Sequence, residues 1–596
     1  MATQVDNSIQ IVDMNEEVQR ANVDERQNME KKKIVIFEVD ERPPWYLAIV
    51  LGFQHFLTFI GSGITLPLLL AGPLCMDQDQ VAVSQLISTA FFIEGFITLL
   101  QVTFGVRLPV VQGGSFAFLV PAFALLNTYG ECQVSLTPNS TREEMDNYTD
   151  VWQTRMRKIQ GAIIGASFLQ ILIGFTGIIG FLLKFIGPVT VAPVVALVGI
   201  GIVVPAASRA GQHWGIAALT IVSILIFSQF LSKIEIPLFG WKRGKCSIIG
   251  KASIFRMFPI VLGALLTWLI SLVFTASGVF PKSPSTYGYA ARTDLKSYAI
   301  EEASWFYIPY PGQWGLPIIT LAGVLGMFSA VIASVIESLG DYYATARMAG
   351  APPPPAHAVN RGIGVEGIGC VLAGLWGTAN GTTTFSQNAG LVGLTRVGSR
   401  VVVQICALFM IVVGMLGKVT ALFSSIPVPI VGGILCILFG TVLAVGLSNL
   451  QYVDLNSPRN LLIIGFSLIM GMLIPNWVGS NRDLVQTGIL ELDQVIVVLL
   501  TTGMFIGGLL AFFLDNIIPG TIEERGLVAF SQQYKEDDDG INSLDVYDLP
   551  FGMTVLRQWK WTQYIPFSPT YARKRIIVGK KDGYNVDNVE TNENGV

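Results

Sequence analysis

Two carboxylates stand four residues apart in an otherwise apolar stretch of the chain. Glu337 and Asp341 belong to the sequence IESLGDYYATA, and their spacing places both on one face of a helix. An ionisable residue inside a membrane span is costly and indicates function. Because two such carboxylates repel each other unless a cation or a proton lies between them, the pair predicts a binding site, in which Glu337 accepts a substrate N–H and Asp341 orders a cation or the neighbouring polar segment. The alternative is a structural pair held by backbone or hydroxyl donors.

A polar, glycine-rich stretch lies between two long apolar segments, from Gly377 to Arg400. It is rich in side-chain amides and hydroxyls: Asn380, Thr382, Thr383, Thr384, Ser386, Gln387 and Asn388. At membrane depth, irregular backbone occurs only where protein or a water-filled cavity satisfies its polar groups. The stretch is therefore the lining of a substrate site, which we favour, or a buried seam between helices. Gln387 offers both a donor and an acceptor to a ligand.

A second interrupted segment, 108–121, reads LPVVQGGSFAFLVP. Its alternation and Gly113-Gly114 predict a short extended piece leading into a half-helix, whose free backbone N–H groups and positive dipole end face a ligand. Phe116 and Phe118 either stack on a flat ring or simply pack. A carboxylate, a carboxamide, an aromatic face and N–H groups together suit a planar heterocycle with N–H and C=O groups. The sequence has no P-loop and no nucleophile–base constellation, so we expect no enzyme.

Other residues carry weaker signals. His55 is the only histidine in a strongly apolar segment, and it is either a site residue or an interhelical hydrogen-bonding group. Cys75 and Cys132 fall in two predicted outside loops, which makes a disulfide between them a hypothesis. Two sequons in the outside loop before the fourth segment predict N-glycosylation of Asn139 and Asn147.

The composition is that of a polytopic membrane protein, with 52% hydrophobic and 13% charged residues. Apolar windows of about 20 residues can each cross a bilayer. About fourteen occur, at 46–70, 82–104, 110–126, 159–183, 187–206, 214–231, 255–277, 317–344, 362–378, 382–394, 401–422, 427–447, 458–475 and 492–516. The expected fold class is all-α, with short extended pieces in the third and tenth segments, where interruption marks a site between two repeats.

Traces of repetition indicate two halves of seven segments. Phe185 and Pro188 introduce the fifth segment, as Phe423 and Pro427 introduce the twelfth. An odd number of segments per half puts the halves in opposite orientations. The basic loop 232–256 places both termini in the cytosol. The polar start of the chain does not read as a signal peptide, and we expect the first segment to act as its own insertion signal.

Four motifs resemble the nucleobase–ascorbate transporter family, over roughly residues 44 to 530. QNAGLVGLTR, from Gln387 to Arg396, resembles its signature of a polar residue, N-x-G and T-[RK]; the others are Gln54-His55, QGGSF at 112–116 and ESLGD at 337–341. Other stretches look like the vertebrate branch, which contains the sodium-dependent vitamin C transporters. Those carry Pro where this chain has Gln387, and Gln there is typical of carriers of xanthine or urate. We therefore expect a closer resemblance to the vertebrate sodium-dependent nucleobase transporter.

The resemblance implies roles, an architecture and a motion. It implies substrate binding by Glu337, Gln387, Phe116, Ser115, Asn388 and Gln54, and a sodium ion near Asp341, His55 and Thr384. It implies two inverted repeats in which a core domain moves against a gate domain in an elevator-like way, in a homodimer. The corresponding divisions are a cytosolic tail (1–44), core (45–183), gate (184–277), an outside loop (278–316), core (317–422), gate (423–517) and a second cytosolic tail (518–596).

Together these features predict a plasma-membrane symporter that imports nucleobases, of the uracil, xanthine, hypoxanthine, guanine and urate class, with sodium. The expected partners are the base, sodium ions, the lipid bilayer and a second copy of the chain, without nucleic acid and without a cofactor besides the coupling ion. The alternatives are ascorbate transport, proton coupling in place of sodium, and a channel or a base-binding membrane protein that does not translocate.

Overall fold

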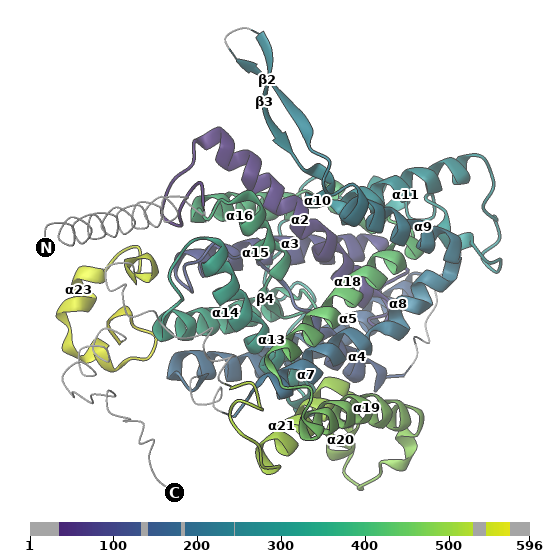
Figure 1. Cartoon of the computed structure of the whole chain (residues 1–596). Helices are drawn as coiled ribbons and strands as arrows, with labels where there is room; N and C mark the ends of the chain where they lie inside the picture. The colour runs from purple at the N-terminus through teal and green to yellow at the C-terminus, as the bar shows by residue number, and fades with distance from the viewer. Residues whose placement is uncertain are drawn as a thin grey trace, which may run out of the picture.

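The structure is a computed structural model that describes residues 35–130, 132, 141–179, 185–242, 245–527 and 544–571. It is a bundle of long helices with two small β-ribbons (Figure 1). Nine helices of the described chain are long and apolar enough to cross a membrane, and the number rises to ten if the bent pair α20 (Leu490–Thr501) and α21 (Gly503–Ile517) is one span. The predicted helical, polytopic class is confirmed.

The first part of the chain contains α2 (Trp45–Ala71), α3 (Gln80–Thr103), β1 (Gln112–Gly114), η1 (Phe116–Phe118), α4 (Leu119–Asn127), α5 (Arg142–Thr176), α7 (Pro188–Gly201), α8 (Val203–Ala210), η2 (Gly211–His213), α9 (Trp214–Leu225), η3 (Ile226–Phe230), β2 (Ile236–Lys242), β3 (Lys245–Ala252), α10 (Ile254–Met257) and α11 (Pro259–Ala276). A connecting region follows with η4 (Tyr289–Ala291) and α12 (Tyr298–Glu302).

The second part contains α13 (Leu321–Met348), α14 (Ala356–Trp376), β4 (Thr382–Thr384), α15 (Ser386–Thr395), α16 (Arg400–Gly414), α17 (Gly417–Ser424), α18 (Val428–Ser448), η5 (Asn449–Tyr452), α19 (Pro458–Ser480), η6 (Arg482–Leu484), α20 and α21. Beyond them lie η7 (Leu544–Tyr547), α23 (Met553–Gln558) and η8 (Lys560–Tyr564). In Figure 1 this last, yellow part lies at the side of the bundle, next to α14.

The expected count of about fourteen spans is not reached by helix length and apolarity. The third segment is divided into β1, η1 and the nine-residue helix α4. The segment 401–422 is divided into α16 and α17, and the last segment bends by 75° between α20 and α21. Interrupted segments of this kind pass a composition test but not a test of continuous helix length.

The two expected extended pieces pair with each other, although they lie far apart in the sequence. β1 and β4 form an antiparallel ribbon in which Gln112 faces Thr384 and Gly114 faces Thr382. The amide N–H of Ser115 donates to the carbonyl of Gly381 over 2.9 Å, and that of Phe385 donates to Val111 over 2.9 Å. The ribbon therefore fixes the starts of two short helices, η1 with α4 and α15, relative to each other.

A second ribbon departs from the all-helical expectation. β2 and β3 pair antiparallel within the stretch that we expected to be a basic loop, and Figure 1 shows this hairpin projecting away from the bundle. The reason lies in the composition: IPLFGWK and KCSIIGKA contain β-branched and aromatic residues, which favour strands. The basic residues on which we based the orientation do not prevent pairing.

Glycines bring helices α5 and α14 into close contact. A Cβ atom added at Gly174 would lie 2.2 Å from the backbone nitrogen of Gly364, so no larger residue fits there. Small residues at helix interfaces let backbones approach each other closely inside a membrane. This contact places the buried side chain of Glu366, on α14, against α5.

Candidate functional site

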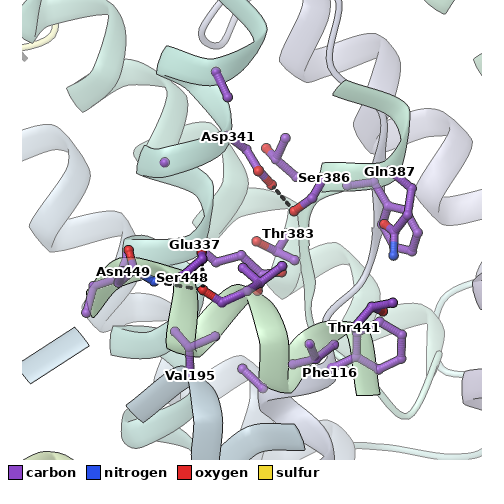
Figure 2. A pocket seen from close by; sticks show the side chains of 18 of the residues that line it. Phe116, Val195, Glu337, Asp341, Thr383, Ser386, Gln387, Thr441, Ser448 and Asn449 are labelled. Carbon is purple, nitrogen blue, oxygen red and sulfur yellow. Dashed lines mark hydrogen bonds between the residues drawn. The ribbon is translucent and has the colours of Figure 1, made fainter. Parts of the chain in front are cut away.

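A cavity of ≈ 890 Å³ lies next to the β1–β4 ribbon. One side is formed by α13, η1 and the start of α15, and the other side by α7 and α18. Figure 2 shows Glu337 and Asp341 on one helix, with Ser386 and Gln387 across from Asp341, and Thr441, Ser448 and Asn449 on the α18 side. The cavity therefore brings the two predicted chemical elements, the carboxylate pair and the polar stretch, to one place.

The two carboxylates of α13 have different surroundings. The hydroxyl of Ser386 donates to Oδ2 of Asp341 over 2.9 Å, which joins the first residue of α15 to α13. The Glu337 carboxylate, one turn earlier, lines the cavity without a hydrogen-bonding partner among the described residues. Glu337 is thus available to a ligand, whereas Asp341 is already held in place.

A third carboxylate supports the ribbon from behind. Glu366 is fully buried, and its Oε1 accepts hydrogen bonds from Ser338 over 2.9 Å and from Thr384 over 3.3 Å. Its Oε2 accepts a longer one from Gln170 at 3.4 Å. Thr384 also accepts from the side-chain amide of Gln112 over 2.8 Å. A chain of hydrogen bonds therefore connects α5, α14, α13 and both strands of the ribbon.

Glu366 is a residue that the sequence interpretation missed. It stands in the apolar segment 362–378, where the rule that singled out Glu337 and Asp341 applies equally. The signal was thus present in the sequence. What the sequence lacked was the packing of α14 against α13, β4 and α5, which supplies its partners.

Five of the predicted site residues line the cavity: Glu337, Asp341, Gln387, Phe116 and Thr384. Gln387 is exposed at the start of α15. Phe116 keeps 6% of its surface exposed and packs edge-on against Phe439, with the ring centroids 5.3 Å apart. A ligand beside the Phe116 ring would also contact polar groups of α13 and α15, which line the same cavity.

The other four predicted site residues are buried behind the lining. Ser115 accepts from the amide of Ala117 over 3.3 Å and so caps η1. The side-chain amide of Asn388 donates to the carbonyl of His55 over 2.9 Å and lies 3.2 Å from its Nδ1. Gln54 is 6% exposed, and its Nε2 has no partner in the described chain. The contact of Asn388 with His55 joins α15 to α2, and none of the four residues lines the cavity.

The charges of the lining favour a cation at its inner end. Glu337 and Asp341 repel each other when both are ionised, and an ionised Glu366 behind them adds to that repulsion, so a cation in the cavity would stabilise their charged forms. Of the described lining residues, Arg347 alone is basic, and it stands in the last turn of α13. Carboxylate and hydroxyl oxygens are the ligands that hard cations prefer. Asp341 with Ser386 and Thr384 is the part of this site that suits a small cation.

The structure also places the residues that we expected outside the membrane. Cys75 and Cys132 are joined by a disulfide. Asn147 is exposed in the first turns of α5, and Asn139 lies outside the described residues.

Comparison with known proteins shows the family. The sequence pattern described as the permease family matches residues 47–479. The chain is a member of this permease family. It is 48% identical over 541 residues to solute carrier family 23 member 2 of Rattus norvegicus, covering 90% of this chain and 83% of the relative. It is 47% identical over 555 residues to member 1 of the same organism, covering 91% and 90%.

A plant member of the permease family is also similar. Nucleobase-ascorbate transporter 1 of Arabidopsis thaliana is 37% identical over 537 residues, covering 88% of this chain and 97% of the relative. A transporter of a small molecule with several membrane-spanning helices is therefore supported.

The expected closer resemblance to a nucleobase transporter is wrong, and so is the nucleobase symporter predicted from it. The relatives at 47–48% identity are members 1 and 2 of solute carrier family 23, whereas the plant relative whose name includes a nucleobase is 37% identical. The purine and pyrimidine specificity rested on one position, Gln387. Identity spread over some nine-tenths of the chain outweighs one side chain, even one that lines the cavity.

Proposed function

We propose that the chain is a sodium-coupled importer of ascorbate. The observation that carries the proposal is the 48% identity with solute carrier family 23 member 2, which extends over 90% of the chain. The vertebrate branch that the motifs resemble contains the vitamin C transporters, and the plant relative carries ascorbate in its name. This was the alternative to the nucleobase prediction.

The polar groups of the cavity suit ascorbate. This molecule is a small planar lactone with an enediol and side-chain hydroxyls, so it needs both donors and acceptors. Glu337 accepts from a ligand hydroxyl in this proposal, and the amide of Gln387 and the hydroxyl of Thr383 donate to ring oxygens. Phe116 covers the lactone ring. Asn388, Ser115 and Gln54 hold the lining from behind rather than touch the ligand.

Sodium resolves an electrostatic conflict in this site. Ascorbate is a monoanion at neutral pH, and it would enter next to Glu337 and Asp341. A sodium ion on Asp341, with hydroxyl oxygens from Ser386 and Thr384, reduces the repulsion, while His55 fixes α15 through Asn388. A proton on the carboxylate pair is the alternative coupling ion. One sodium ion neutralises the substrate charge, so a tenfold sodium gradient contributes ~1.4 kcal/mol and about tenfold accumulation.

The transport motion is proposed to follow the family architecture. Fourteen segments form two inverted repeats of seven, and the core domain (45–183 and 317–422) moves against the gate domain (184–277 and 423–517) in a homodimer. Two features support this: the ribbon joins the third and tenth segments, and the cavity lies between residues of the two proposed domains, such as Glu337 and Thr441. Both termini lie in the cytosol and the protein resides in the plasma membrane.

Labelled uptake tests the proposal. Cells expressing the full chain are given ascorbate, xanthine or uracil, in sodium and then in choline at constant pH. We expect ascorbate uptake that is lost in choline and absent from Glu337→Gln cells with normal surface expression. Absence of ascorbate uptake at verified surface expression contradicts the proposal, as does uptake of a base in its place. Ascorbate uptake that does not depend on sodium would indicate that a proton is the coupling ion.

A further inference from the structure

A second cavity, of ≈ 290 Å³, lies away from the site described above. It is lined by the end of α2, the start of α3, α8 with the following turn, the start of α18 and one residue of the 278–316 region. Its polar lining residues are Asp77, Gln80, Ser208, Arg209, Gln212 and Lys296. Two of these side chains are cations and one is a carboxylate.

Arg209 reaches across this cavity from α8 to α2. Its Nη2 donates to the carbonyl of Leu69 over 2.8 Å, in the last turn of α2, and weakly to that of Leu68 at 3.5 Å. A guanidinium at a helix C-terminus is stabilised by the helix dipole. No carboxylate of the described chain lies within ion-pair distance of it, although Asp77 is near enough to interact electrostatically. Backbone carbonyl groups alone therefore accept its hydrogen bonds, and Asp77 acts on its charge only from a distance.

Lys296 brings a second positive charge to the same place. It comes from the connecting region between α11 and α13, for which the sequence suggested no role. The pKa of Lys296 is lowered to about 8, chiefly by burial and also by Arg209, while Asp77 opposes the shift. The ammonium group of Lys296 also lacks an ion pair or a hydrogen bond to any described residue. Asp77 can compensate at most one of the two cations.

We propose that this cavity binds a small monovalent anion, held by Arg209 and Lys296. Burying a charge is costly unless a charge of opposite sign accompanies it. The hydroxyl of Ser208 and the amides of Gln212 and Gln80 add hydrogen-bond donors, which an anion requires. The anion is either chloride from the medium or the organic anion that the protein carries; the second source rests on the proposed function.

At this position a bound anion would contact helices of both proposed domains. Arg209 belongs to α8 and its carbonyl acceptors to α2, and the cavity also touches the start of α18. In the proposed architecture α2 belongs to the core domain, and α8 and α18 to the gate domain. A bound anion therefore bridges the two domains at the outer end, opposite the end of α13 and α18 that the larger cavity reaches.

Thermal unfolding of the purified full-length protein tests the anion site. Sodium chloride replaces sodium gluconate at constant sodium and ionic strength. We expect a saturable rise of Tm with chloride in the wild type, and a chloride concentration at half-saturation that increases at least tenfold in Lys296→Gln. The matched control is Lys282→Gln, an exposed lysine of the same region. Asp77→Asn should lower the half-saturating chloride concentration severalfold, because it removes the competing negative charge.

Two arms separate the sources of the anion. A titration with sodium ascorbate in gluconate replaces the chloride titration. If ascorbate raises Tm in a Lys296-dependent way and chloride does not, the carried anion is the occupant; the reverse result assigns chloride. If the wild type, Lys296→Gln and Asp77→Asn show the same change of Tm with both anions, the proposed anion site is wrong. Because the chloride titration needs no transport, it stands or fails independently of ascorbate uptake.

Discussion

The hydroxyl of Ser386 donates a 2.9 Å hydrogen bond to Oδ2 of Asp341, which joins the start of α15 to the middle of α13. Ser386 is followed at once by Gln387, the exposed amide of the cavity. Any change in the charge of Asp341 therefore acts directly on the residue that presents Gln387. This gives the coupling ion a direct route to the substrate groups, one helical turn from Glu337.

Ser386→Ala should weaken the response to sodium. A hydrogen bond to a charged group contributes about 1.5–3 kcal/mol, so its loss raises the half-saturating sodium concentration for ascorbate uptake roughly tenfold or more. Initial uptake rates over a sodium titration measure this. The control is Ser448→Ala, because Ser448 lines the same cavity but donates to Val445 within its own helix. An unchanged sodium response in Ser386→Ala would separate Asp341 from the coupling ion.

Glu366→Ala should destabilise the protein. The change leaves the hydroxyl of Thr384 without its acceptor in a fully buried region, and it leaves the hydroxyl of Ser338 with only that of Thr383, 2.7 Å away. Each orphaned donor costs about 1–3 kcal/mol, so we expect a clear drop of Tm together with loss of uptake.

The matched variant is Glu366→Gln, which keeps an oxygen acceptor at the same distance from the backbone. Glu366→Gln should keep most of the stability that Glu366→Ala loses. Equal Tm values for Glu366→Ala and the wild type would show that the network is not needed to hold the ribbon.

Sequence alone singled out residues that line the cavity, but it did not predict how they are arranged. Glu337 and Asp341 were found because charge inside hydrocarbon demands an explanation. The pairing of Gln112 with Thr384 was not predictable, because no local pattern fixes the register of two three-residue strands from distant segments. The contact of His55 with Asn388 depends on the same packing. The prediction of the substrate failed for a different reason. Gln387 supplies one hydrogen-bonding group, and several polar ligands can use it.

Cys75→Ser should destabilise the region between α2 and α5. The disulfide to Cys132 closes a sequence separation of 57 residues, for which chain entropy gives an upper estimate of about 4 kcal/mol. We expect a lower Tm and lower surface delivery, with the same result for Cys132→Ser and for the double variant. Cys436→Ser, a change at a free and partly exposed cysteine, is the control. Two free thiols in a non-reducing digest of the wild type would contradict the linkage.

Gly113→Ala should abolish transport by displacing Phe385. A Cβ atom at Gly113 would lie 2.5 Å from two ring carbons of Phe385 and 3.3 Å from Phe59. Because Phe385 directly precedes Ser386, moving its ring shifts the start of α15 away from Asp341. We expect more than tenfold lower ascorbate uptake at unchanged surface expression.

Gly465→Ala is the matched control, since a Cβ atom there meets no neighbour within 4 Å. In the middle of α19 this change should be neutral or stabilising by up to about 1 kcal/mol. Wild-type uptake in Gly113→Ala would mean that Phe385 can move without moving Ser386. The ribbon would then serve only to support the bundle, and the alignment of Asp341 with α15 would have to come from the contact of Asn388 with α2.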